Sequence, residues 1–211
     1  MHIISFVTQK GGSGKTTLAV NCAVVAVQQG QKVFVLDMDD QATAERWFDW
    51  RSDELPQVKR VSPAQLDAAL SGLRSKGFDV VLIDTPGRDD VGVAAAMRAS
   101  DFCLIPCRPS PADIQATPPT IETVKRLGKK CAFVLTQTPV RSYRLREAEK
   151  GLGVYGVVCS VHIVLRNAYQ DAQGAGLGVT ELEPNGKAAD EMRRLWAWIT
   201  KKVERVEHGN E

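Results

Sequence analysis

The stretch Gln9-Lys10-Gly11-Gly12-Ser13-Gly14-Lys15-Thr16-Thr17 follows an apolar run at residues 3–7 and precedes a second apolar run at residues 18–26. This order predicts a strand, a glycine-rich turn and a helix, which is the arrangement that a phosphate-binding loop requires. Glycines allow backbone N–H groups to approach an anion, and the start of a helix adds unpaired donors. Lys15 can reach the terminal phosphates, and the Thr16 hydroxyl can ligate Mg²⁺. We therefore expect this stretch to bind a nucleoside triphosphate.

The match to the usual phosphate-loop pattern has one departure and one addition. Gln9 occupies the position of the first glycine, and Lys10 is a second lysine placed before the double glycine. Without the flanking strand and helix, these residues would suggest only a flexible turn with solvated lysines. The segment from Lys10 to Thr17, K-G-G-S-G-K-T-T, resembles the deviant Walker A motif of the ParA/MinD group of ATPases. The resemblance implies that Lys10 crosses a dimer interface to the partner's ATP; the alternative is an exposed loop cation.

Composition limits the class of protein. The chain has 211 residues, of which 44% are apolar and 25% are charged, as expected for one soluble globular domain spanning residues 1–211. A net charge of +2 does not indicate nucleic-acid binding, so any basic surface must come from local clustering. The five cysteines lack the spacing of a metal site and are expected to be buried free thiols. With no signal peptide and no apolar run near the ~18 residues of a membrane span, a cytoplasmic protein is expected.

Two later apolar runs end in aspartate. The run at residues 32–36 leads into Asp37, and the run at residues 80–83 leads into Asp84. In open parallel sheets, ligands bind at the carboxyl ends of the strands, where these side chains would meet. The second run is typical of a Walker B strand, which is buried on both faces and directs its last carboxylate at the metal. We expect Thr16 and Asp84 to hold Mg²⁺, partly through water.

The segment Asp37-Met38-Asp39-Asp40-Gln41 resembles the D-x-D-P-Q segment of the same family, with Asp40 in place of the proline. The resemblance implies that Asp39 positions the attacking water and that Asp37 helps to hold the Mg²⁺ shell. The alternative interpretation is that Asp39 or Asp40 caps the following helix, which could coexist with catalysis.

The rest of the chain alternates between strands and helices. Apolar periodicity predicts strands at residues 2–7, 57–61, 101–105, 131–135 and 157–161, and helices at residues 15–29, 42–51, 63–75, 112–127 and 187–206. Pro118-Pro119 should interrupt the fourth of these helices, and the glycines at 174, 176 and 178 should form a flexible loop. The alternation predicts a three-layer α/β/α fold of the P-loop NTPase type, with a mostly parallel twisted sheet.

The loop that follows the expected strand at residues 131–135 begins with Thr136 and Gln137. The family resemblance places this loop beside the nucleotide base, so both residues are expected to contribute to cofactor binding. The chain lacks the N-K-x-D motif that reads guanine in GTPases, and this favours ATP over GTP.

The resemblance covers essentially the whole chain and is strongest at residues 2–45 and 79–87. It implies a small, plasmid-type ParA ATPase, with weak, partner-stimulated ATP hydrolysis, whose ATP-sandwiched homodimer binds double-stranded DNA nonspecifically. Such a protein would associate with the nucleoid and, with a cognate adaptor, would segregate or position plasmid or chromosome cargo. Lys10, Lys15 and Mg²⁺ would stabilise the developing charge, while Asp39 would orient the water.

The expected DNA contacts are basic residues in the last third of the chain: Arg141, Arg144, Arg146 and Arg166. Two other functions remain open. One is a membrane-associated, MinD-like positioning ATPase, although the polar C-terminal segment makes a weak anchor, so no stable membrane association is expected. The other is a positioning ATPase for a protein assembly, which differs only in its adaptor.

Overall fold

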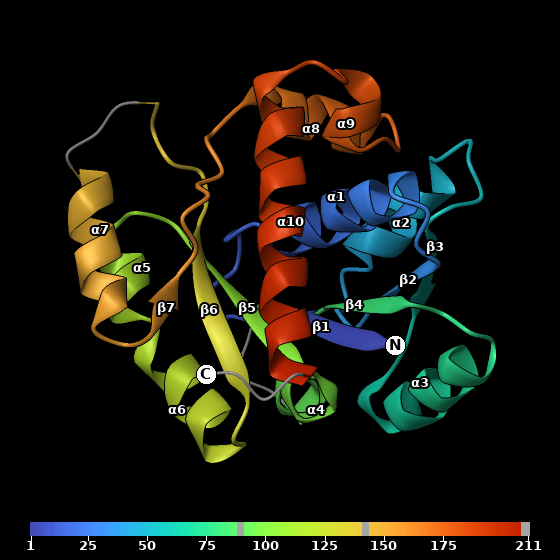
Figure 1. Ribbon diagram of the computed structural model, residues 1–211, viewed down its shortest axis with the longest axis horizontal. Helices are drawn as coiled ribbons and strands as arrows, with labels where there is room; N and C mark the ends of the chain where they lie inside the picture. The colour runs from blue at the N-terminus through green and yellow to red at the C-terminus, as the bar shows by residue number, and fades with distance from the viewer. Residues whose placement is uncertain (88–90, 141–143, 208–211) are drawn as a thin grey trace.

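The computed structural model describes residues 1–87, 91–140 and 144–207, and its centre is one parallel sheet of seven strands (Figure 1). The strands lie in the order β3-β2-β4-β1-β5-β6-β7. Their bounds are His2–Phe6 for β1, Val33–Asp37 for β2, Gln57–Arg60 for β3, Val80–Asp84 for β4, Phe102–Cys107 for β5, Lys130–Leu135 for β6 and Val157–Val158 for β7. The middle strands are mostly apolar because helices cover both of their faces.

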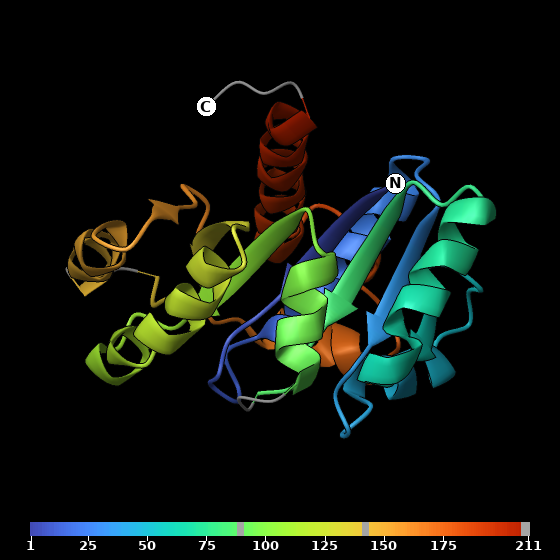
Figure 2. The same cartoon turned by 90° about the horizontal axis from the view of Figure 1, so that it is seen from below.

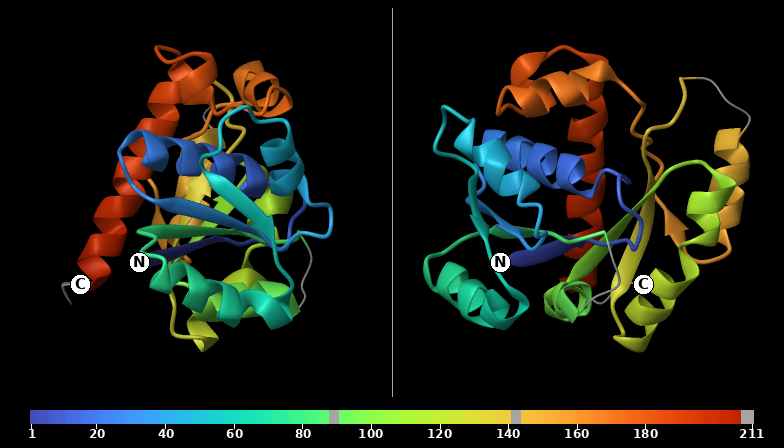
Figure 3. Two further views of the ribbon diagram at one scale, coloured as in Figure 1. Left: turned by 90° about the vertical axis from the view of Figure 1, so that its right-hand side faces the viewer. Right: turned by 180° about the vertical axis from the view of Figure 1, so that it is seen from behind.

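Ten helices in the described part of the chain form the outer layers, which confirms the expected α/β/α fold (Figure 2, Figure 3). One layer contains α1 (Lys15–Gln28), α2 (Thr43–Asp49), α8 (Asn167–Gly174), α9 (Val179–Leu182) and α10 (Lys187–Glu207). The other layer contains α3 (Leu66–Ser75), α4 (Val91–Ala99), α5 (Pro111–Gln115), α6 (Pro118–Arg126) and α7 (Arg144–Gly153). The expected break at Pro118 separates α5 from α6.

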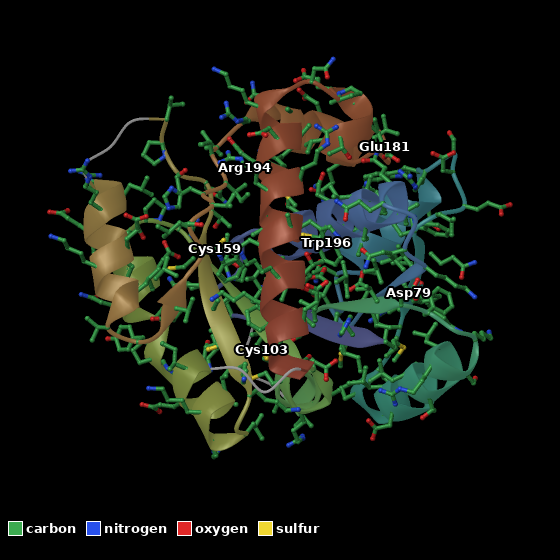
Figure 4. All side chains as sticks on the ribbon, in the orientation of Figure 1. Asp79, Cys103, Cys159, Glu181, Arg194 and Trp196 are labelled. Atoms are coloured by element: carbon green, nitrogen blue, oxygen red, sulfur yellow. The ribbon has the colours of Figure 1, made fainter. Side chains whose placement is uncertain are left out.

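Helix α10 packs on the core along its apolar stripe, as its periodicity predicts. Ala188, Met192, Leu195, Ile199 and Val203 are all buried against the layer that contains α1. The indole of Trp196, labelled in Figure 4, is also fully buried, and its Nε1–H donates to Gln31 Oε1 at 3.1 Å. Within the described ranges, no helix is both long and apolar enough to cross a membrane.

The segment around residues 174–178 differs from the expected flexible loop. Helix α8 ends at Gly174, and α9 begins directly after Gly178. A Cβ at Gly178 would lie 2.9 Å from Val24 Cγ1, and one at Gly176 would lie 2.5 Å from the carbonyl carbon of Trp50. These two glycines therefore allow the backbone to pack closely against α1 and the end of α2, rather than providing flexibility.

Two other expectations need correction. Strand β7 ends at Val158, not at residue 161. Beyond it the backbone makes separate hydrogen bonds to β6, from Cys159 N to Phe133 O and from Ile163 N to Leu135 O, while it crosses the carboxyl edge of the sheet. An apolar run alone does not distinguish a strand from such an extended segment. In addition, four helices had no counterpart among the expected elements: α4, α7, α8 and α9.

Candidate nucleotide-binding site

The glycine-rich loop connects β1 to α1 at the carboxyl edge of the sheet. Gly12 and Gly14 have φ angles of 69° and 97°, a region in which a side chain would strain the backbone. Lys15, the first residue of α1, is only 6% exposed, and its ammonium donates to the Lys10 carbonyl at 3.2 Å. Burial lowers the pKa of Lys15, whereas the nearby charges of Asp84 and Asp39 raise it. The loop thus curls around one buried cation.

The segment after β6 holds the loop from its other side. Thr136 Oγ1 donates to the Ser13 carbonyl at 2.8 Å, and Gln137 Nε2 donates to the Gly12 carbonyl at 2.7 Å. Gln137 adopts a left-handed φ of 50°, which is uncommon for a residue with a side chain. These bonds fix two loop carbonyls, so Thr136 and Gln137 support the loop itself in addition to lying beside it.

Asp84 and Asp37 end adjacent strands and are register partners, so their carboxyl groups meet beside the loop. Both are fully buried, and within the described residues neither Asp84 oxygen accepts a hydrogen bond. Burial raises the pKa of Asp84 to about 7, although the neighbouring Thr16 hydroxyl and the Lys15 charge favour its ionised form. A buried carboxylate without a partner, next to a hydroxyl, suits the oxygen-rich shell of a Mg²⁺ ion held partly through water.

Asp37 has a structural role that the sequence did not reveal. Its Oδ1 accepts from Asp39 N at 3.0 Å, and its Oδ2 accepts from Ala44 N at 3.0 Å and Glu45 N at 3.1 Å. The carboxylate that caps α2 is therefore Asp37, rather than Asp39 or Asp40. Burial raises the pKa of Asp37, and these three N–H donors lower it. Its part in the metal shell remains a prediction.

The capped loop presents Asp39 to the site. Its carboxylate is half-buried and accepts from Gln41 N at 3.0 Å, and its charge acts on Lys15. Asp40, in the place of the family's proline, forms an ion pair of 2.7 Å with Arg60. Asp39 is thus held next to the phosphate loop, as its expected role in positioning water requires.

The segment after β4 touches the loop directly. A Cβ at Gly87 would lie 3.0 Å from Gly11 Cα and 3.1 Å from Gly11 N, so the two backbones are in contact. Thr85 anchors this segment by donating to the Phe6 carbonyl at 2.7 Å. Residues 88–90, which follow directly, lie outside the described residues.

A cavity of about 150 Å³ lies beside the loop, between the start of α1 and residues 163–170. Gly14, Thr17, Leu18, Thr136 and Gln137 line one side of it. The cavity extends the phosphate loop toward the C-terminal third of the chain. Its position and its mixed apolar and polar lining suit the nucleoside part of a nucleotide.

Comparison with known proteins identifies the family. A family model described as an AAA domain matches residues 1–62. The Maintenance of carboxysome distribution protein A of Halothiobacillus neapolitanus is 33% identical over 196 residues, covering 88% of this chain and 90% of that protein. The chain belongs to the ParA/MinD family of P-loop ATPases.

A further relative and a solved structure each match nearly the whole chain. The protein of the same name from Gloeobacter kilaueensis is 29% identical over 214 residues, covering 97% of this chain and 94% of that protein. The solved structure of MinD with Mg-ADP from Pyrococcus horikoshii has a TM-score of 0.77 and 19% identity, covering 97% and 98% of the two chains. The structural likeness supports the same parallel-sheet architecture.

One wall of the cavity beside the phosphate loop depends on Glu191 of α10. This carboxylate is 4% exposed and accepts from Arg166 Nε at 3.0 Å, Arg166 Nη2 at 2.6 Å, Tyr169 Oη at 3.0 Å and Val164 N at 3.2 Å. Sequence reasoning missed Glu191. The available signal was an acid beside the apolar stripe of an otherwise core-facing helix, a position that needs a buried partner.

The structure places the arginines expected to contact DNA in different environments. Arg166 lines the cavity and its guanidinium is paired with Glu191 within the fold. Its contact with DNA stays a prediction. Arg144 and Arg146 lie on the exposed side of α7. Arg141 lies outside the described residues.

Replacing Glu191 with leucine should lower the free energy of unfolding by about 2–3 kcal/mol, because it leaves Arg166 and Tyr169 without their acceptor. Urea denaturation measures this change. Asp190→Ala is the matched control, since the pair of Asp190 with Arg194 is exposed and should contribute less than about 1 kcal/mol. Equal losses in the two variants would contradict a special role for Glu191.

Proposed function

We propose that this protein is a positioning ATPase that dimerises on ATP, binds double-stranded DNA without sequence preference and moves a cargo through an adaptor protein. The observation that carries the proposal is Lys10. Lys15 already occupies the centre of the phosphate loop, and its ammonium is bonded to the Lys10 backbone. The second lysine is therefore available for the nucleotide of another subunit, a role that the family relationship supports.

In the proposed reaction, Lys15 binds the terminal phosphates, and Asp39 orients the attacking water. Thr16 and Asp84, with help from Asp37, would hold Mg²⁺, which would supply positive charge next to the phosphate oxygens. Lys10 of the second subunit completes the site. Hydrolysis is slow in the isolated dimer and is stimulated by the adaptor.

The comparisons favour a protein assembly as the cargo. Two relatives are named for maintaining the distribution of carboxysomes, and this chain covers 90% and 94% of their lengths. Plasmid or chromosome segregation is the second candidate, since it uses the same switch with another adaptor. A MinD-like membrane role receives less support, because the apolar stripe of α10 is packed on the core over residues 188–203.

The proposed DNA surface consists of exposed basic residues on α7 and α10, which are Arg144, Arg146, Lys150, Arg193, Arg194 and Lys201. Arg194, labelled in Figure 4, lies on the outer side of α10. Dimerisation doubles this surface, so DNA binding would depend on ATP without any contact between ATP and DNA. DNA binding would also place the protein on the nucleoid.

DNA affinity should be much higher with ATP than with ADP. If the dimer neutralises roughly six phosphates, log K should fall against log salt with a slope of about −5. Filter binding across a salt series measures the slope. Joint replacement of Arg144 and Arg146 with alanine should flatten it, whereas Arg74→Ala, on α3 near the opposite edge of the sheet, should not (Figure 1). Equal affinity with ADP, or no dependence on salt, would exclude the proposed mode of binding.

A further inference from the structure

A groove lies between the edge strand β3 and α3, and residues of the neighbouring strand β2 also line it. It encloses about 360 Å³, and its floor is apolar, with Phe34, Leu36, Val61 and Leu73. On α3, Gly72 lines the groove, and a Cβ there would meet no atom within 4 Å. The protein's own side chains therefore leave room for a further apolar group.

The rim of this groove is basic. Lys59, Arg60 and Lys76 line it, and among the described residues its lining contains no acid. Lys59 and Lys76 are both exposed, and Arg60 is 47% exposed at its side chain. An apolar floor under a rim of cations is complementary to a chain that carries apolar side chains next to carboxylates.

We propose that the groove between β3 and α3 docks an acidic segment of a partner protein, whose apolar side chains fill the floor while its carboxylates pair with Lys59, Arg60 and Lys76. The apolar floor of the groove favours a ligand with apolar side chains over one that is only charged. The cations of the rim disfavour a basic segment. The edge position of β3 leaves the groove open from the side of the sheet. In the proposed function, this partner is the adaptor.

Arg60 connects the groove to the site of hydrolysis. It is the register partner of Asp37, its backbone N–H donates to Glu45 at 3.3 Å, and its guanidinium pairs with Asp40 at 2.7 Å. Asp40 follows Asp39 directly. Because the Arg60–Asp40 pair is exposed, a carboxylate of the partner can compete for Arg60 at little cost and release the loop that carries Asp39.

The test uses a short peptide of leucine and glutamate, and its counterpart with lysine in place of every glutamate. NMR of the nitrogen-labelled, nucleotide-free protein should show that the acidic peptide shifts the resonances of Lys59, Gly72 and Lys76. The lysine peptide should leave them unchanged. Because no nucleotide is present, this result does not depend on ATP hydrolysis, dimerisation or DNA binding, so failure of the proposed function and failure of the groove are distinguishable.

Variants locate the binding. Gly72→Leu should place an apolar side chain in the groove, since a Cβ there meets no atom within 4 Å, and should weaken the acidic peptide at least tenfold. Lys59→Glu should weaken it severalfold. Arg74→Glu is the matched charge control on α3, outside the groove, and should bind as the wild type does. Equal binding of the lysine peptide, or unchanged affinity in Gly72→Leu, would overturn the docking site.

A further variant tests the competition for Arg60. Asp40→Asn removes the carboxylate that now pairs with Arg60, so the acidic peptide should bind severalfold more tightly. Unchanged affinity in this variant would overturn the link between the groove and the Asp39 loop.

Discussion

Replacement of Lys15 with alanine is expected to reduce ATP hydrolysis at least ~100-fold and to weaken nucleotide binding. Lys15 is 6% exposed, and its ammonium lies within the phosphate loop, where it donates to the Lys10 carbonyl. Removing this ammonium leaves the loop without the positive charge that would bind the terminal phosphates. Phosphate release and the binding of a fluorescent ATP analogue measure the two effects.

Lys32→Ala is a suitable control for Lys15→Ala. Lys32 is exposed, and its ammonium bonds to the Lys76 carbonyl, away from the loop. That variant should keep wild-type hydrolysis. Wild-type rates in Lys15→Ala would show that the phosphate loop does not carry the reaction.

Lys10→Ala and Asp39→Ala should separate dimerisation from hydrolysis. Lys10→Ala should bind ATP but remain monomeric, because Lys15 still serves the subunit's own phosphates. Asp39→Ala should dimerise on ATP, while its hydrolysis falls about 100-fold, because the water loses its oriented acceptor. Light scattering with ATP and with ADP measures the oligomeric state of each variant.

Asp67→Ala provides a control, since this carboxylate is exposed on α3, away from the phosphate loop and from the Asp39 segment. It should dimerise on ATP and hydrolyse it at a rate within a few-fold of the wild type. A Lys10→Ala protein that forms the ATP dimer normally would remove the proposed role of Lys10 between subunits.

Local patterns in the sequence were enough to predict the fold and the phosphate loop. The apolar runs before Gly11 and Asp84 are buried strands, as expected, because a parallel sheet covered on both faces requires continuous apolar residues. The glycines of the loop were informative because Gly12 and Gly14 need positive φ angles. Such signals depend on neighbours in the chain, and a single sequence contains them.

The partners of the site residues depend on contacts between distant segments, and only the tertiary structure decided them. Glu191 meets Arg166 across 25 positions, and Gln137 meets the Gly12 carbonyl across 125. Asp37 was recognised as an acid at a strand end, but its capping of α2 depends on how the intervening loop folds back. Many residues could satisfy a buried donor or acceptor equally well on chemical grounds, so residue type alone does not identify the partner. The packing of the layers brings one of these residues within hydrogen-bonding distance and thereby determines which pair forms.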